Sequence, residues 1–79
     1  MSSIWRLNVA LAESGKTRSP WYKDISLGVM TRPVKIGIRA VGWPADEVRA
    51  INAARISGKS IEQIRKLVDQ LHDARKAVR

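Results

Sequence analysis

The stretch from residue 17 to residue 43 changes its apolar period partway along, and this change limits the fold more than any other feature of the sequence. Before Gly28 the apolar residues have the spacing of one helix face: Trp21, Tyr22 and Ile25. After Gly28 they alternate, as in a half-buried strand: Val34, Ile36 and Ile38. Gly37 can then turn the chain into a returning strand. The stretch predicts a helix of about two turns followed directly by a small β-hairpin.

Capping signals mark the limits of this helix. Ser19 can accept backbone N–H bonds as an N-cap, and Pro20 then stands at the first helical position, where no N–H is missed. Gly28 suits a left-handed C-terminal cap. We therefore expect the helix at residues 20–27.

An earlier helix is expected at Leu7–Ser14, where apolar residues are spaced by three and four, and Gly15 should end it. Residues 16–18 would form the turn between the two helices. Residues 1–5 are expected to be a loose tail, with Trp5 the first residue that packs.

The hairpin is expected to begin near Val34, because Pro33 disfavours a central strand at its own position. Its tip should lie at residues 37–39 and its return at residues 40–43. A short helix entered through a tight turn and followed at once by a hairpin is the sequence form of a winged helix-turn-helix, in which the helix enters a DNA groove and the wing touches the backbone.

Pro44 is expected to open a third helix that ends at Gly58. Two acidic residues in its first turn favour the positive end of the helix dipole: Asp46 and Glu47. Its predicted core contacts are Val48 and Ile51.

A last helix has the clearest start, because Ser60 and Gln63 form a capping-box pattern. Its apolar stripe, which Arg75 interrupts, consists of Ile61, Ile64, Val68, Leu71 and Val78. This stripe either packs on the rest of the chain or forms a homodimer seam through Ile61, Ile64, Val68 and Leu71. The predicted fold is mostly α with a small β-hairpin wing: a winged helix-turn-helix (excisionase- or MerR-like) at residues 1–58, with a C-terminal helical extension at residues 59–79.

Positive charge is concentrated in one part of this 79-residue chain, whose formal net charge is +8. Residues 16–39 contain one acid, Asp24, and six bases: Lys16, Arg18, Lys23, Arg32, Lys35 and Arg39. A compact basic surface suits phosphate binding, because each neutralised phosphate releases counterions. The alternative is that these charges only keep a small protein soluble.

Other kinds of chemistry find little support. The absence of cysteine excludes disulfides and thiolate metal sites, and a cytoplasmic, nucleoid-associated protein is expected. No apolar run approaches the ~20 residues of a membrane helix. His72 has no second histidine as a partner and is expected at the surface, and Gly58-Lys59-Ser60 lacks the first glycine of a phosphate-binding loop because Ala53 stands there. We expect no enzymatic activity, metal or cofactor.

A set of short motifs lies between residues 17 and 48, within a stretch of family resemblance that covers about residues 5–56. They are TRS at residues 17–19, Tyr22 and Ile25, Gly28, RPVKIG at residues 32–37, RAVGWP at residues 39–44, and the pair Glu47 and Val48. These motifs resemble those of the AlpA family of phage and prophage regulators, which are small excisionase-like winged-helix proteins. Residues 54–79 resemble an extension found in one branch of that family. The resemblance implies sequence-specific DNA binding by a transcriptional regulator of integrase or other mobile-element genes, or by an excision factor that bends DNA.

The resemblance also implies which residues meet DNA. It assigns Arg18, Ser19, Tyr22 and Lys23 to a recognition segment, and Lys35 and Arg39 to the wing. The complete predicted DNA-binding set is Lys16, Arg18, Ser19, Tyr22, Lys23, Ser26, Arg32, Lys35 and Arg39. Two alternatives stay open: Tyr22 is either a core ring or a phosphate contact, and Asp24 either repels phosphate or accepts from a cytosine amino group. Pro20 and Trp21 depart from the family pattern.

The predicted function is a sequence-specific regulator that binds double-stranded DNA, with a recognition helix at residues 19–27 in the major groove and a wing at residues 35–39 on the backbone. Besides excision, two alternatives are a protein-interaction module that uses the C-terminal helix and a protein that binds structured RNA.

Overall fold

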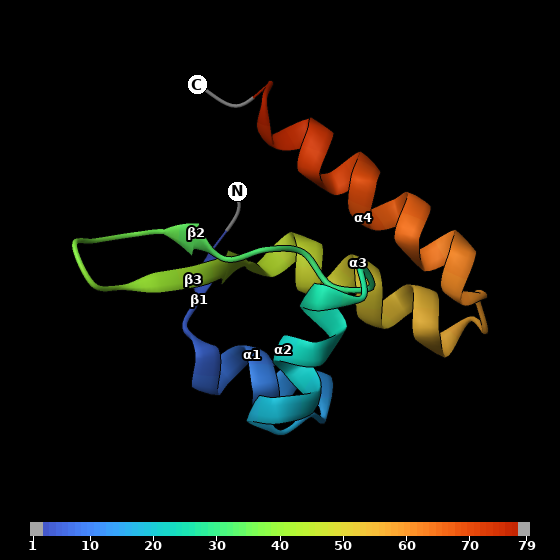
Figure 1. The fold of residues 1–79 in the computed structure, drawn as a ribbon, viewed down its shortest axis with the longest axis horizontal. Helices are drawn as coiled ribbons and strands as arrows, with labels where there is room; N and C mark the ends of the chain where they lie inside the picture. Colours follow the sequence, from blue (N-terminus) through green and yellow to red (C-terminus); the bar gives the residue numbers. More distant parts are fainter. Residues whose placement is uncertain (1–2, 78–79) are drawn as a thin grey trace.

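The computed structural model describes residues 3–77, which form four helices and three short strands (Figure 1). In chain order the elements are β1 (Ile4–Trp5), α1 (Leu7–Ser14), α2 (Arg18–Ser26), β2 (Val34–Lys35), β3 (Val41–Pro44), α3 (Ala45–Ile56) and α4 (Ile61–Arg75). The strands form one antiparallel sheet in the order β1-β3-β2. The predicted mostly helical fold with a small hairpin is confirmed at this level. In the described part of the chain, no helix has the length and apolar character that crossing a membrane requires.

The first helix, α1, has the predicted bounds and ends at Gly15 in the left-handed region, with φ of 63°. The start of α2 differs from the prediction, since its N-cap is Thr17 and its first residue is Arg18. The predicted N-cap at Ser19, with Pro20 at the first position, is therefore wrong. Pro20 is the third helical residue, and a proline there removes no helical bond because the first N–H groups of a helix have no partner within it.

The end of α2 also lies one residue earlier than predicted, because Leu27 is its cap rather than its last residue. Gly28 follows in the left-handed region with φ of 79°, as expected. Its N–H donates to the carbonyl of Ile25, and the N–H of Val29 donates to the carbonyl of Asp24. These bonds satisfy carbonyl groups that the helix end would leave without partners.

The expected loose tail is wrong for the described residues 3–5. Ile4 pairs with Pro44 and Trp5 with Trp43, so β1 lies along β3, and the N–H of Ala45 donates to the carbonyl of Ser3. A two-residue strand has no period of its own, and its partner lies far along the chain. No local pattern in the sequence could therefore have indicated it.

The predicted hairpin is present. Val34 pairs with Gly42 and Lys35 with Val41, and the N–H of Ile36 donates to the carbonyl of Ala40 at 2.9 Å, which closes a tip of residues 37–39. Directly opposed residues of an antiparallel pair share a face. One face of the sheet carries Trp5, Lys35, Val41 and Trp43, and the other carries Ile4, Val34, Gly42 and Pro44.

Two tryptophans form the centre of the core. Trp21 of α2 and Trp43 of β3 are fully buried, and their rings meet edge to face with centroids 5.3 Å apart and planes at 80°. Trp43 Nε1 donates to the carbonyl of Thr31 at 2.9 Å, which fixes the α2–β2 connection against the sheet. The predicted core role of both rings is confirmed. Trp5 is only half-buried and lies beneath the guanidinium of Arg49, 4.8 Å from it.

The other two helices complete the same core. In α3, which begins after the cap residue Pro44, the predicted contacts Val48 and Ile51 are fully buried. In α4 the predicted capping box is present, since Ser60 Oγ accepts from the N–H of Gln63 and the Gln63 side chain accepts from the N–H of Ser60.

The apolar stripe of α4 packs partly within the chain. Ile64 and Val68 are buried in the core, Leu71 is half-buried and Ile61 is 59% exposed. Val78 lies outside the described residues. The homodimer seam through these side chains stays a prediction, and forming it through Ile64 and Val68 would require α4 to leave its own core.

Candidate nucleic-acid interface

An open hollow of about 460 Å³ lies between α1, α2 and the β2–β3 hairpin. Its lining residues, which define the basic hollow, are Arg6, Leu7, Asn8, Arg18, Tyr22, Arg39 and Val41. Three arginines from separate parts of the chain thus border one hollow, and no acidic residue is among the described residues that line it. Arginines gathered in this way favour an anionic ligand with several oxygen atoms.

The helix starts beside the basic hollow carry partial positive charge, which has the same sign as the arginine side chains that line the hollow. Arg6 is the N-cap of α1 and Arg18 is the first residue of α2, and in the described chain neither start has a side-chain cap or an acid in its first turn. The free N–H groups of a helix start carry partial positive charge. Arg18 is unfavourable for the helix at this position, yet it stays exposed at the hollow and contributes charge to it.

The Arg18 guanidinium lies over the ring of Tyr22, 5.8 Å from its centre, and Tyr22 is 40% exposed. The Tyr22 ring also approaches Trp43 edge-on, with centroids 6.4 Å apart. Tyr22 therefore has one edge on the core and the other in the basic hollow. The ring contact expected if Tyr22 belongs to the core is present, and the phosphate contact stays a prediction.

Five of the predicted residues share the exposed side of α2: Arg18, Ser19, Tyr22, Lys23 and Ser26. At the α-helical repeat they span an arc of about 140° around the helix axis, opposite the buried Trp21. The Ser26 hydroxyl donates to the carbonyl of Lys23 at 2.7 Å, so its own hydrogen is already engaged. The exposed arc is a surface on which an elongated ligand can lie along α2.

Lys16 and Asp24 differ from the rest of the predicted set. Lys16 Nζ lies 2.7 Å from Asp24 Oδ2, and the same oxygen accepts from Arg55 of α3 at 3.1 Å. The Asp24 side chain is only 14% exposed. The charge of Lys16 is thus neutralised within the protein, and Asp24 ties α2 to α3 instead of facing a ligand as either alternative for it required.

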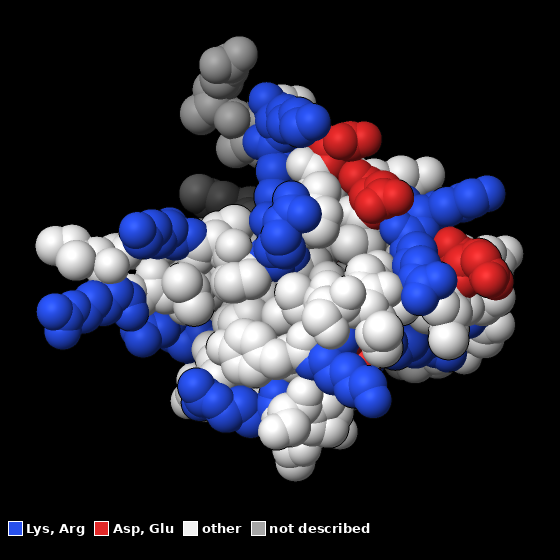
Figure 2. Space-filling model, viewed as in Figure 1, with Lys and Arg blue, Asp and Glu red and all other residues white. Residues whose placement is uncertain are grey.

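The remaining predicted residues lie on and beside the hairpin. Lys35 is exposed and stands opposite Val41, whose side chain lines the basic hollow, so both point to the same face of the sheet. Arg32 is exposed in the connection before β2, and its main chain bonds to α4. Figure 2 shows Lys and Arg side chains around the hairpin, whereas the acidic residues visible on that face lie over α4.

Arg6 and Asn8 line the basic hollow but were missed by the sequence analysis. Arg6 falls between the expected tail and the predicted helix at Leu7–Ser14, and Asn8 lies within that helix, where its polar side chain gives no sign of a site. A usable signal was present, however. An arginine at a helix start with no acid in the first turn opposes the usual preference for negative charge there.

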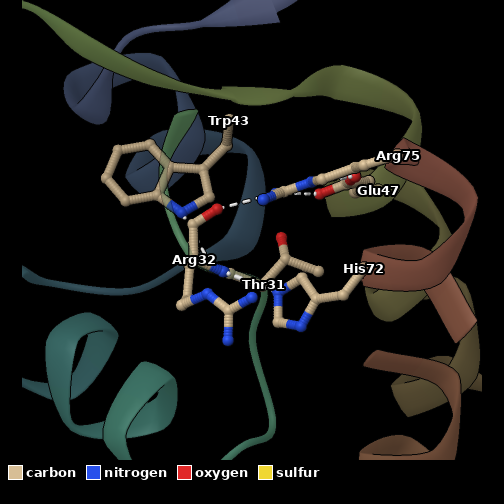
Figure 3. A network of polar contacts seen from close by, with 6 residues as sticks. All are labelled: Thr31, Arg32, Trp43, Glu47, His72 and Arg75. Atoms are coloured by element: carbon tan, nitrogen blue, oxygen red, sulfur yellow. Dashed lines mark hydrogen bonds and ion pairs between the residues drawn. The ribbon is translucent and has the colours of Figure 1, made fainter. Parts of the chain in front are cut away.

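A second polar cluster lies where α4 meets α3 and the connection before β2 (Figure 3). Arg75 donates to both carboxylate oxygens of Glu47, at 2.7 and 2.5 Å, and to the carbonyl of Arg32 at 2.7 Å. The Glu47 side chain is only 8% exposed. Arg75, which interrupts the apolar stripe in the sequence, is therefore the residue that pairs with a buried carboxylate.

The prediction of a surface position for His72 holds only in part, because His72 is half-buried and its Nε2 accepts from the N–H of Arg32 at 3.1 Å. Burial lowers the pKa of His72 below its ordinary value of 6.5, and the charges of Arg32 and Arg75 lower it further, against smaller opposing effects of Glu47 and Asp69. The neutral form, which can accept this bond, is favoured.

Searches of protein-family models, curated proteins and solved structures found no match to this chain.

Proposed function

We propose that the protein is a sequence-specific DNA-binding regulator of the winged helix-turn-helix kind, as the resemblance to the AlpA family implies. In this proposal α2 enters the major groove, and the β2–β3 hairpin is the wing that holds the backbone. The observation that supports it most directly is the convergence of Arg6, Arg18 and Arg39 on the basic hollow, beside two helix starts without side-chain caps.

The exposed arc of α2 supports the choice of reading helix. Arg18, Tyr22 and Lys23 project from it, and arginine or lysine can bond to guanine edges in the major groove. Arg6 and Arg39 line the hollow beside this arc, and Lys35 is exposed on the hairpin opposite Val41. All three would neutralise phosphates, which fixes orientation without reading sequence. The same binding mode serves a transcriptional regulator and an excision factor.

The test is selection of bound duplexes from a random-sequence DNA pool, followed by mobility shifts on the enriched duplex. Arg18→Ala should weaken binding to the enriched duplex by about 1–3 kcal/mol and relax its specificity, because it removes a base contact. Arg39→Ala should weaken binding to all duplexes alike. Lys59→Ala is the matched control, since it removes an exposed charge in the α3–α4 connection, at the other end of the molecule from the hairpin.

Two results would count against the proposal. If no sequence is enriched over random duplex, specific reading is wrong. If a duplex RNA of the same length competes better than DNA at physiological salt, the basic hollow serves RNA instead. The deep, narrow major groove of A-form RNA does not admit side chains from a helix such as α2.

A further inference from the structure

The tip of the β2–β3 hairpin exposes an apolar side chain to solvent. Ile38 is 93% exposed, more than any other large hydrophobic residue in the described part of the chain. It is the middle residue of the three-residue tip that the Ile36–Ala40 hydrogen bond closes. In Figure 1 this tip extends well beyond the helices, so no neighbouring element covers it.

Single exposed apolar residues are ordinary on protein surfaces, but this one does not stand alone. Ile36 is 41% exposed and Val41 is 38% exposed on the two strands that lead into and out of the tip, one on each face of the hairpin. Turn positions usually carry residues such as Gly, Asn, Asp or Ser. Neither Ile38 nor its neighbour Gly37 has a left-handed backbone conformation. The backbone therefore accepts most residue types at position 38 and does not itself account for an isoleucine there. An apolar group at the end of a projecting arm is suited to insertion into a binding partner.

The charges around the tip indicate which class of partner Ile38 would contact. Arg39 follows Ile38 directly and lines the basic hollow, and Lys35 is exposed on the first strand. Where Figure 1 has the hairpin tip, Figure 2 shows uncharged atoms with Lys and Arg atoms beside them. A partner that meets Ile38 must therefore combine an apolar slot with dense negative charge. Duplex DNA has this combination, since the stacked bases are apolar and phosphates flank both sides of each groove.

We propose that Ile38 inserts between two neighbouring base pairs from the minor groove, while Lys35 and Arg39 hold the phosphates on either side. Isoleucine is one of the side chains that proteins use as wedges of this kind, and insertion unstacks the step and kinks the duplex. The inference rests on the proposed function, and it adds a contact that neither α2 nor the arginines of the basic hollow provide.

The experiment uses the full chain and the duplex enriched by selection, or a mixed-sequence duplex if none is enriched. The adenine analogue 2-aminopurine is placed in turn at each step beside the bound region, and dyes at the two ends report bending by energy transfer. The protein should raise 2-aminopurine fluorescence at one step and bend the duplex by about 20–90°. Ile38→Ser should lose both signals while its mobility shift persists, and Ile38→Met should keep them because it still supplies an apolar wedge.

Ile56→Ser is the matched control, because Ile56 is 88% exposed at the far end of α3 and should leave both signals intact. If the protein shifts duplexes but Ile38→Ser retains unstacking and bending, the wedge is wrong and the DNA-binding proposal stands. If the protein shifts no duplex at all, the wedge and the DNA-binding proposal are both wrong. If Ile38→Ser affects only sedimentation with phosphatidylserine vesicles, the tip meets a membrane surface and the wedge is again wrong.

Discussion

Asp24 controls how much positive charge is exposed around the start of α2. Its carboxylate binds Lys16 from the turn before α2 and Arg55 from α3, and Arg55 also donates to the carbonyl of Val29 at 3.3 Å. One acid thereby joins three segments and withdraws one predicted charge, that of Lys16, from the surface. A basic residue beside an exposed helix such as α2 is thus not by itself evidence of a ligand contact.

Replacing Asp24 with Asn should destabilise the protein by about 1–3 kcal/mol, because Arg55 would lose a charged partner in a partly buried site. Urea unfolding followed by tryptophan fluorescence measures this change. Asp73→Asn removes the same charge from an ion pair with Lys76 in which both side chains are largely exposed, and it should change stability little. Equal effects of the two substitutions would show that Asp24 is no more than a surface charge.

His72 should make stability fall in mildly acidic solution. Its pKa is lowered in the folded protein but lies near 6.5 in the unfolded chain, so the unfolded state binds the proton first. The stabilisation from neutral His72 is present above pH 6.5 and is lost as the pH falls toward the lowered folded pKa. Melting temperatures should drop as the pH falls below about 6.5, and the drop should be smaller in His72→Gln, which accepts a bond without titrating there. An unchanged pH profile in His72→Gln would contradict this assignment.

At the residue scale, the sequence predicted three of the seven residues that line the basic hollow: Arg18, Tyr22 and Arg39. It could assign them because motif and helix face fix their direction. It could not show that Lys16 turns toward Asp24, since the second partner, Arg55, comes from α3. The choice of ion-pair partner depends on tertiary packing rather than on local spacing.

At the scale of elements, the pairing of β1 with β3 leaves no room for a side chain at Gly42. A Cβ added there would stand 2.6 Å from Ile4 Cγ2 and 2.9 Å from the carbonyl oxygen of Trp5. The isoleucine could shift, but the carbonyl belongs to the paired strand and cannot move without disturbing the ladder. Gly42 is therefore required by space, since its backbone angles are ordinary.

Gly42→Ala should destabilise the protein by about 1–3 kcal/mol through overpacking. Gly37→Ala in the same hairpin is the control, because an added Cβ would meet its nearest neighbour, Ala40, at an ordinary 3.5 Å. Thermal unfolding followed by circular dichroism compares the two. A Gly42→Ala protein as stable as Gly37→Ala would mean that β1 does not lie where the pairing puts it.

Elements differed in how readily the sequence predicted them. The capping box at Ser60, the helix end at Gly15 and the left-handed cap at Gly28 depend on interactions within a few residues, and they were predicted correctly. The start of α2 was not, because Pro20 fits any position in the first turn and so does not fix the helix start. The strand β1 exists only through its long-range pairing with β3.

At the scale of the whole molecule, the charge distribution predicts how DNA binding depends on salt. If Arg6, Lys35 and Arg39 each neutralise one phosphate, log K should fall with log salt with a slope of about −2.7. Arg6→Ala should bring this slope to about −1.8, whereas Lys59→Ala should leave it unchanged. Fluorescence anisotropy titrations over a range of salt concentrations measure it. The same slope for Arg6→Ala as for the unaltered protein would remove Arg6 from the binding surface.

The packing of α4 makes the C-terminal segment part of the fold. Ile64 and Val68 enter the same core as Trp21 and Trp43, and Arg75 bonds to the connection before β2. The sequence left packing within the chain and dimerisation both open, because an apolar stripe has the same pattern in either case. In the structure Ile64 and Val68 pack within the chain, and Ile61 at the start of α4 stays exposed.

The perpendicular pair of Trp21 and Trp43 has a spectroscopic consequence. Two indoles held this close in a fixed orientation couple their electronic transitions, so the folded protein should show a paired positive and negative band in its ultraviolet circular dichroism. Trp5 is half-buried beneath Arg49 and stands opposite Trp43 on the same face of the sheet. Trp43 thus lies beside both of the other indoles, and the optical signals of the three report one packed region, the contact of α2 with the sheet.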